Sequence, residues 1–257
     1  MKAQHVSLKT LFCRGRSWSE KMSENQSFDP VWDEKYDQGF YQHAPWDAVV
    51  QAIFRQTPKD MPRGDVKILE IACGSGSNIC FAAGMGFAVT GIDASQKAVH
   101  LARTNFKGKG LAARIDWGDF TRLPYEKESF HMVIDRCGIS HTGFSMAEKA
   151  IGEAWRVLKP GGIFFWIPFS DRHSSAASGR QGDKEDAGRI HGGLRIGIDE
   201  GDIVGNGQAC FYNQSDIQRM LPPILWALEV MEHMEYYNAL RPLRSVYAEW
   251  RVTARKI

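Results

Sequence analysis

Residues 68–78 read Ile-Leu-Glu-Ile-Ala-Cys-Gly-Ser-Gly-Ser-Asn, an apolar run that passes into a glycine-rich turn. Residues 66–72 predict a buried strand and residues 78–85 predict a helix, so the glycines lie in the turn between them. Glycine lets the backbone approach a ligand closely, and the first turn of a helix offers unpaired N–H groups. The stretch therefore predicts a site for a nucleoside-containing cofactor.

A second strand is predicted at residues 88–92, and Asp93 follows it. A carboxylate at this position can accept hydrogen bonds from both ribose hydroxyls. A dinucleotide fingerprint would require a third glycine after Gly74 and Gly76, but Ile79 stands there. No Gly-Lys-Ser/Thr loop occurs either, so the sequence does not indicate pyrophosphate binding.

Strands and helices alternate through most of the chain, which predicts an α/β fold with a parallel sheet and right-handed crossovers. The further strands are expected at residues 114–117, 131–135, 163–167, 228–237 and 247–253. The further helices are expected at residues 95–105, 147–158 and 215–220.

The regions around this core predict the domain organisation. Residues 1–27 are polar and basic and are interpreted as a flexible tail, within which Met22 is an alternative start. Residues 28–64 are expected to form a helical cap, with Trp32, Tyr36 and Phe40 on one helix face and a second helix from Asp47 to about residue 56. Residues 65–257 form the main domain, with a substrate-side insert at about 169–210. The insert shows little periodicity, and a solvated loop is the alternative to a functional element there.

Bulk properties exclude several classes of protein. The chain has 257 residues, 43% of them hydrophobic and 24% charged, as in a globular protein. A net charge of +2 gives no strong nucleic-acid signal. The 5 cysteines form no C-x-x-C pair, which argues against a metal site or a disulfide framework and favours the reducing cytoplasm. No apolar run approaches the roughly 20 residues that span a bilayer, so no membrane association is expected.

Four stretches in order resemble the motifs of class I S-adenosylmethionine (SAM) dependent methyltransferases, and together they cover about residues 65–168. They are 69–76 (Leu-Glu-Ile-Ala-Cys-Gly-Ser-Gly), 91–95 (Gly-Ile-Asp-Ala-Ser), 118–130 with Gly-Asp-Phe and Leu-Pro-Tyr, and 153–162 ending in Lys-Pro-Gly-Gly. Ala72 replaces the first glycine of the family pattern, which removes some backbone freedom. The resemblance implies a three-layer Rossmann-like fold, with a mostly parallel seven-stranded sheet and an antiparallel last strand.

The same resemblance implies the roles of the cofactor site. Asp93 would hold the ribose, Asp119 would accept from the adenine amino group with the Phe120 backbone beside the ring, and Gly74 and Gly76 would admit the methionyl and ribose parts. Glu70 would lie beneath them. The expected site also includes Ala72, Asn78, Ala94, Ser95 and Asp135. Taken alone, Glu70 could be a strand-end charge and Asp119 a turn residue. The implied cofactor is SAM, its product is S-adenosylhomocysteine, and no metal is expected.

The methyl acceptor should lie beyond the carboxyl ends of the fourth and fifth strands. Residues 135–141 read Asp-Arg-Cys-Gly-Ile-Ser-His, without the Pro-Pro-Tyr or Pro-Cys motifs of nucleobase methyltransferases. His141 is the candidate base and Arg136 a second candidate catalytic group, although a surface or hydrogen-bonding histidine is an equal alternative for the former. Cys137 is interpreted as a packed thiol. His173 and His191 are interpreted as histidines of a mobile loop.

The N-terminal stretch 32–36 (Trp-Asp-Glu-Lys-Tyr), with 45–47 (Pro-Trp-Asp), is similar to the opening of small-molecule methyltransferases of the thiopurine and tellurite-resistance type, including the type 11 group. There it covers cofactor and substrate, which would add Tyr36 and Trp46 to the site; ordinary packing is the alternative. The expected partner is a small-molecule acceptor methylated on O, N or S. An RNA or protein methyltransferase and a catalytically silent SAM-binding protein stay open, as does the oligomeric state, a dimer included.

Overall fold

The computed structural model describes residues 27–182, 192–240 and 245–257. A seven-stranded sheet has the order β3-β2-β1-β4-β5-β10-β9. The first five strands pair in parallel, and β10 runs antiparallel to both of its neighbours. The strands are β1 (Lys67–Ile71), β2 (Ala88–Asp93), β3 (Arg114–Trp117), β4 (Phe130–Arg136), β5 (Leu158–Ile167), β9 (Trp226–Tyr237) and β10 (Val246–Lys256). This confirms the expected Rossmann-like architecture.

Helices cover both faces of the sheet. Successive strand residues such as Ile68 and Leu69 therefore point into two different hydrophobic clusters, one on each face. One cluster includes residues of α2 (Asp47–Gln56), α3 (Ser77–Gly84) and α4 (Gln96–Gly108). The other includes residues of α5 (Phe144–Val157) and α6 (Gln214–Met220). The three layers place the carboxyl ends of the parallel strands at one edge, which is where ligands bind in open α/β sheets.

The insert at 169–210 contains more regular structure than its sequence indicated. It holds a short 3-10 helix, η4 (Ser174–Ala177), and a three-stranded antiparallel sheet of β6 (Arg180–Gln181), β7 (Gly193–Ile196) and β8 (Gln208–Phe211). Every residue of β7 and β8 is buried. A strand that is buried on both faces shows no alternation, so the interpretation of the described part as a solvated loop is wrong.

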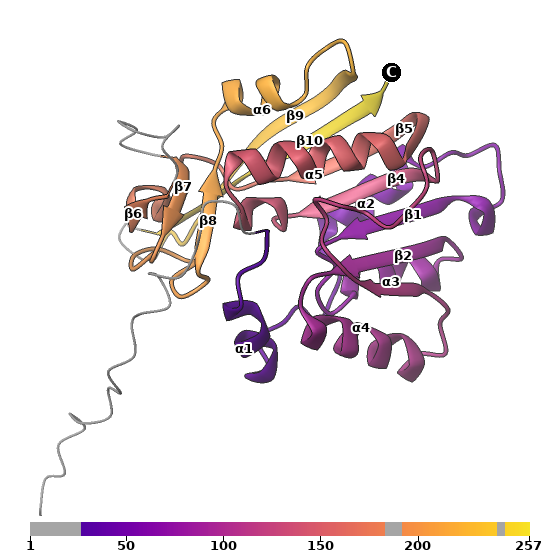
Figure 1. Ribbon diagram of the computed structural model, residues 1–257, viewed down its shortest axis with the longest axis horizontal. Coiled ribbons are helices and arrows are strands. Elements are labelled where there is room, and N and C mark those ends of the chain that lie inside the picture. Colours follow the sequence, from indigo (N-terminus) through magenta and orange to yellow (C-terminus); the bar gives the residue numbers. More distant parts are fainter. Residues whose placement is uncertain (1–26, 183–191, 241–244) are drawn as a thin grey trace, which may run out of the picture.

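The N-terminal region forms α1 (Val31–Asp37) and then α2, and α2 has the predicted bounds. Helix α1 ends at Asp37, and Gly39 follows in the left-handed region with φ of 78°. Phe40 therefore lies outside the helix, and its expected place on one helical face with Trp32 and Tyr36 is wrong. Figure 1 shows α1 and the β6–β8 sheet together at the same end of the main sheet.

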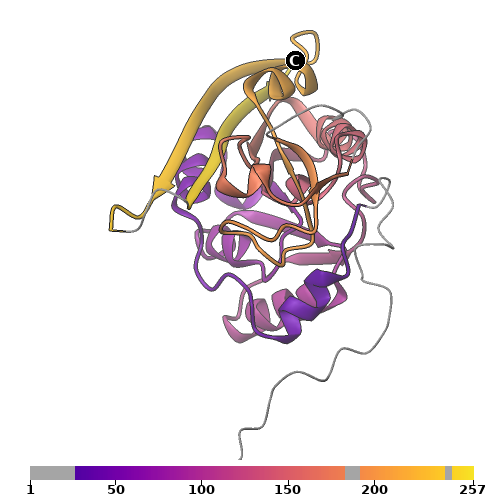
Figure 2. The same cartoon turned by 90° about the vertical axis from the view of Figure 1, so that its left-hand side faces the viewer.

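Figure 2 looks onto this end of the molecule, with the β6–β8 sheet in front and the long β9–β10 hairpin curving beside it. Two further 3-10 helices are η2 (Arg63–Asp65) before β1 and η3 (Ile139–His141) after β4. None of the helices in the described parts of the chain is long and apolar enough to cross a membrane. The tail predicted at residues 1–27 lies almost entirely outside the described residues.

Candidate active site

A cavity of about 480 Å³ opens at the carboxyl ends of the parallel strands, between the N-terminal region and the insert. Most of the predicted site residues line it. These are Tyr36, Trp46, Glu70, Ala72, Gly74, Asn78, Asp93, Ala94, Phe120, Arg136 and His141. The strand ends thus bring the expected cofactor residues and the two candidate catalytic residues into one space.

The other four predicted residues do not line the cavity. Gly76 has φ of 73°, and a Cβ there would meet Ala102 and Phe106 of α4 at 3.3 Å, so this glycine permits close packing between helices. Ser95 caps α4 by accepting from the Ala98 N–H at 3.1 Å. Asp135 and Asp119 are held by other bonds.

Asp135 is fully buried at the end of β4, and its Oδ1 accepts from the Ile139 N–H at 3.0 Å. It therefore fixes the start of η3, which carries His141. Asp119 accepts from Thr121 N and Oγ1 at 2.7 and 2.8 Å and from Ser27 Oγ at 2.6 Å. These bonds occupy both of its carboxylate oxygens, so the implied bond to an adenine amino group stays a prediction.

The glycine-rich turn brings backbone very close to the cavity. Ala72 and Gly74 both adopt positive φ, 50° and 55°. A Cβ at Gly74 would lie 2.5 Å from Tyr36 Oη, so only glycine allows the tyrosine hydroxyl to lie against the turn. Asp93 Oδ2 accepts from the Gly74 N–H at 2.8 Å, and Oδ1 accepts from Ser95 N at 2.9 Å. Burial raises the pKa of Asp93 to about 6, although the two hydrogen bonds favour the ionised form and lower the pKa.

Glu70 joins the end of β1 to the N-terminal region. Its Oε1 accepts from Asn78 Nδ2 at 2.6 Å, and Asn78 Oδ1 accepts from Trp46 N at 2.9 Å. Glu70 Oε2 is buried without a hydrogen-bond partner among the described residues, and so is Asp135 Oδ2. Burial raises the pKa of Glu70 to about 8 and that of Asp135 to about 7. Buried carboxyls with unused oxygens suit a cationic ligand, and SAM carries an ammonium and a sulfonium group.

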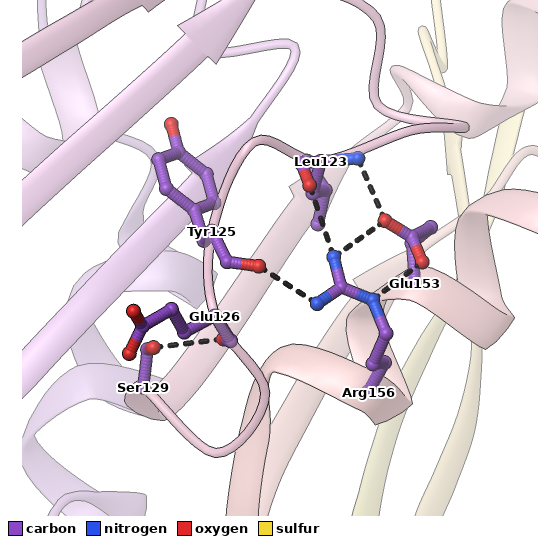
Figure 3. Close-up of polar contacts among 6 residues, drawn as sticks. All are labelled: Leu123, Tyr125, Glu126, Ser129, Glu153 and Arg156. Carbon is purple, nitrogen blue, oxygen red and sulfur yellow. Dashed lines mark hydrogen bonds and ion pairs between the residues drawn. The ribbon is translucent and has the colours of Figure 1, made fainter.

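Phe120 reaches the cavity from a loop that α5 holds in place. Arg156 donates to the Leu123 carbonyl at 2.9 Å and the Tyr125 carbonyl at 2.7 Å, and it pairs with both oxygens of Glu153 (Figure 3). Glu153 Oε2 also accepts from the Leu123 N–H at 2.7 Å. Two of the motifs recognised in the sequence, at 118–130 and 153–162, are thus bound to each other.

Arg136 lies on the acceptor side of the cavity, between two aromatic side chains. Its guanidinium carbon is 3.7 Å from the centre of the Trp46 ring, and Nη2 donates to the Tyr247 hydroxyl at 2.8 Å. Its Nε is buried and has no hydrogen-bond partner in the described part of the chain. The group is therefore a fixed positive charge whose buried Nε–H has no partner among the described residues.

His141 is a neutral histidine in the wall of the cavity. Burial lowers its pKa to about 4, and the charges of Arg136 and Lys35 lower it as well. Its Nδ1 lies 2.9 Å from the carbonyl oxygen of Gln208. A carbonyl only accepts, so Nδ1 carries the ring proton and Nε2 keeps a free lone pair. This tautomer can accept a proton or a hydrogen bond through Nε2.

Two other predicted side chains are buried. Cys137 has φ of 59°, and burial raises the pKa of its thiol to about 12, which agrees with a packed thiol. His173 is 2% exposed and contacts the Phe211 and Tyr247 rings, so the interpretation as a mobile-loop histidine is wrong for it. His191 lies outside the described residues.

Sequence reasoning missed several residues of the wall. They are Phe28, Asp29, Phe169, Ile203, Asn206 and Tyr247. Tyr247 lies near the start of β10, far along the chain, and no local pattern signals its contact with Arg136. Across the described ranges, no three His, Cys, Asp or Glu side chains are grouped so that they could hold a metal ion. The four described cysteines are free and buried.

Comparison with known proteins supports a specific family. Residues 68–162 match a family model described as a methyltransferase domain. An uncharacterised methyltransferase of Bacillus subtilis is 30% identical over 109 residues, which is 42% of this chain and 46% of that protein. A ubiquinone/menaquinone biosynthesis C-methyltransferase of Roseobacter denitrificans is 32% identical over 115 residues, 42% of this chain and 44% of the relative. The match thus spans less than half the length of these curated relatives.

The likeness to solved structures extends over more of the chain. A SAM-dependent methyltransferase of Methanosarcina mazei superimposes with a TM-score of 0.63 and 19% identity, covering 84% of this chain and 99% of that structure. At this level of identity the likeness concerns the fold alone. Residues 68–162 thus match a methyltransferase domain, and the sheet order and the superposition show the fold of class I methyltransferases.

Proposed function

We propose that the protein transfers a methyl group from SAM to a small-molecule acceptor, on O, N or S. One observation carries the proposal: a single cavity joins the glycine-rich turn and Asp93 to Arg136 and His141. Its volume, about 480 Å³, falls in the range of roughly 300–1,000 Å³ that is typical of small-molecule sites. Residues of the N-terminal region and of the insert line it, which favours a small acceptor over a polymer.

The residues present fit the cofactor. Asp93 has two oxygens at the end of β2 for the ribose, in exchange for its present bonds to Gly74 and Ser95. Glu70 and Asp135 supply negative charge beneath the positively charged methionyl part. Phe120 would lie beside the adenine. When bound, SAM supplies a methyl group activated on a sulfonium.

The chain's own residues would then align the acceptor and exclude water, which is the main requirement of an in-line displacement. His141 Nε2 would accept the proton of the acceptor, and Arg136 would stabilise the negative charge that this leaves. Residues 28–64 act in this proposal as a cap, and residues 169–210 select the acceptor. The relative from Roseobacter denitrificans is named for quinone biosynthesis, which supports a small molecule. Four buried free thiols are consistent with a cytoplasmic enzyme.

Calorimetry and a turnover assay test the proposal together. Calorimetry should show SAM binding, and release of S-adenosylhomocysteine should occur with members of a metabolite panel and not with bulk RNA or protein. We expect His141→Ala to lower kcat/KM by 10²-fold or more, as for loss of a general base. His100→Ala, on the exposed face of α4, is the matched control.

Each other outcome identifies an alternative. SAM binding without turnover on any acceptor would indicate a catalytically silent binding protein. Turnover on RNA or protein would replace the small-molecule acceptor with a polymer. An unchanged kcat/KM in His141→Ala would remove the histidine from the mechanism while leaving the cofactor site intact.

A further inference from the structure

The His141 ring is held from behind by a strand of the insert. Its Nδ1 bonds to the main-chain carbonyl of Gln208 at 2.9 Å, and the Gln208 side-chain amide donates to the main-chain carbonyl of His141 at 2.9 Å. Gln208 is the first residue of β8 and is 2% exposed. Both bonds therefore join η3 to the same residue, 67 positions further along the chain.

Gln208 is in turn bound to the N-terminal region. Its N–H donates to Asp29 Oδ2 at 3.2 Å, while Asp29 Oδ1 accepts from Val31 N at 3.0 Å at the start of α1. Asp29 is 7% exposed, so the two bonds are shielded from water. One carboxylate thus links the beginning of α1 to the beginning of β8.

Gly207 allows this carboxylate to approach. Its φ is 76°, and a Cβ on it would lie 1.9 Å from Asp29 Oδ2 and 3.0 Å from Val31 Cγ1. The first distance is far below any real contact, so every other residue type would displace Asp29 or the backbone at 207. Glycine is required at this position both for its conformation and for the space it leaves.

Two aromatic rings complete the surroundings of the histidine. Trp32, in the first turn of α1, packs against the His141 ring with centroids 4.7 Å apart and planes at 75°. Phe169, which follows β5, packs against it at 5.6 Å and 89°. The position of Trp32 depends on how α1 starts, and Asp29 binds that start. The N-terminal region and the insert therefore both determine where the His141 ring lies.

We propose that Asp29, Gly207 and Gln208 form a latch between the N-terminal region and the insert, and that this latch fixes the Nδ1-protonated tautomer of His141. The inference rests on the proposed function, in which His141 Nε2 accepts the proton of the methyl acceptor. Asp29 and Gln208 are then positioning residues. An imidazole without such a partner exchanges between its two tautomers, and only one of them offers Nε2 as a base.

The test is a ¹⁵N NMR measurement of the histidine rings in the full chain, because ring nitrogen shifts distinguish the two tautomers. His141→Gln assigns the signal among the 8 histidines. Gly207→Ala breaks the latch through the clash with Asp29. Asp29→Asn breaks it separately, because an amide has one oxygen to accept from two N–H groups. Gly205→Ala is the matched control: its φ is 74°, but a Cβ there meets nothing within 4 Å.

In the wild-type protein and Gly205→Ala we expect the Nδ1-protonated tautomer alone. In Gly207→Ala and Asp29→Asn we expect both tautomers, with kcat lowered by about tenfold, a part of the 10²–10⁴-fold contribution of a general base. The KM for SAM should change less than twofold in both. A second tautomer in the wild type, or a single unchanged tautomer in both latch variants, would refute the inference.

The NMR result does not depend on knowing the acceptor. If His141→Ala keeps full activity while the latch variants still shift the tautomer, the proposed role of His141 fails and the latch stands. If His141→Ala loses activity and the tautomer is insensitive to the variants, the catalytic role stands and the latch fails.

Discussion

Ala72 adopts a backbone conformation that usually belongs to glycine, and Gly138 provides the space for its methyl group. With φ of 50°, Ala72 lies in the left-handed region, which costs roughly 1–2 kcal/mol for a residue with a Cβ. A Cβ on Gly138 would lie 2.3 Å from the Ala72 Cβ and 2.8 Å from Asp135 Oδ1. The departure from the family glycine was visible in the sequence. The glycine that makes room for the Ala72 methyl group, Gly138 after β4, could not be recognised in the sequence.

This contact predicts a coupling between the two positions. Gly138→Ala should destabilise the protein by about 1–3 kcal/mol, because the new methyl has no room. Its own backbone, with φ of −63° and ψ of −50°, accepts alanine without strain. In an Ala72→Gly background one of the two clashes is gone, so the same substitution should cost at least about 0.5 kcal/mol less. Urea unfolding of the four proteins measures this difference.

Gly152→Ala is the control for the added methyl group. It lies within α5, and a Cβ there meets nothing within 4 Å, so the substitution should stabilise the protein by roughly 0.5–1 kcal/mol. Equal costs of Gly138→Ala in both backgrounds would show that the Ala72 methyl group does not limit the space at Gly138.

Among the elements, α1 differs from the other described α-helices because it buries none of its residues. Side-chain bonds attach it instead: Asp33 bonds to Ser95 Oγ at the start of α4, and Lys97 pairs with Asp37 at 3.0 Å. The latter pair is exposed on both sides and contributes little. By contrast, α2 buries Ala48, Val49, Ala52 and Ile53.

This difference predicts how the two helices exchange amide hydrogens. In the free protein we expect the amides of residues 31–37 to exchange much faster than those of residues 47–56, because local opening of α1 exposes little apolar surface. Saturating SAM should slow exchange in α1, since Tyr36 and the loop that follows line the cavity, and leave α2 unchanged. Hydrogen-exchange mass spectrometry resolves both peptides. Equal protection of the two helices without ligand would contradict this view of α1.

Regular elements could be predicted where local periodicity determines them. Residues 114–117 were expected as a strand and form β3, and α2 begins and ends as expected. The sheet of the insert escaped prediction because β7 and β8 are short and are buried throughout. These strands depend on packing against η3 and the core, and those contacts come from distant parts of the chain.

At the scale of the whole molecule, the arrangement of the strand ends could be predicted. The way in which the N-terminal region and the insert cover these ends could not. Parallel topology alone brings Glu70, Asp93 and Asp135 to one edge of the sheet. The pairing of Gln208 with His141 spans 67 residues, and the bond from Gln208 to Asp29 spans 179. No motif encodes such separations. The sequence therefore predicts the proposed cofactor half of the site in more detail than the acceptor half.

The three buried carboxyl groups make the cavity sensitive to pH as a whole. Burial raises their pKa values, to about 8 for Glu70, about 7 for Asp135 and about 6 for Asp93. Near pH 7 the free protein therefore holds protons on the first two groups that water-exposed carboxyls would release. A bound cation favours the ionised forms and lowers these pKa values, so binding of SAM must release protons.

Affinity for SAM should consequently rise with pH between about 6 and 8, by up to about tenfold per pH unit for each proton released. Above pH 8 Glu70 is ionised in both states, and the dependence should flatten. His141, with its pKa lowered to about 4, does not titrate in this window. Calorimetry in two buffers of different ionisation enthalpy counts the protons directly. S-adenosylhomocysteine lacks the sulfonium charge, so its binding should release fewer protons.

Glu70→Gln isolates the largest contribution to the proton release, because the amide keeps an oxygen for Asn78 and cannot ionise. We expect a smaller proton release and a shallower pH dependence in this variant. Glu148→Gln makes the same change on the exposed surface of α5 and should behave as the wild type. If SAM binding took up protons, or if its affinity fell as the pH rose from 6 to 8, the buried carboxyls would not be the groups that receive the positive charge.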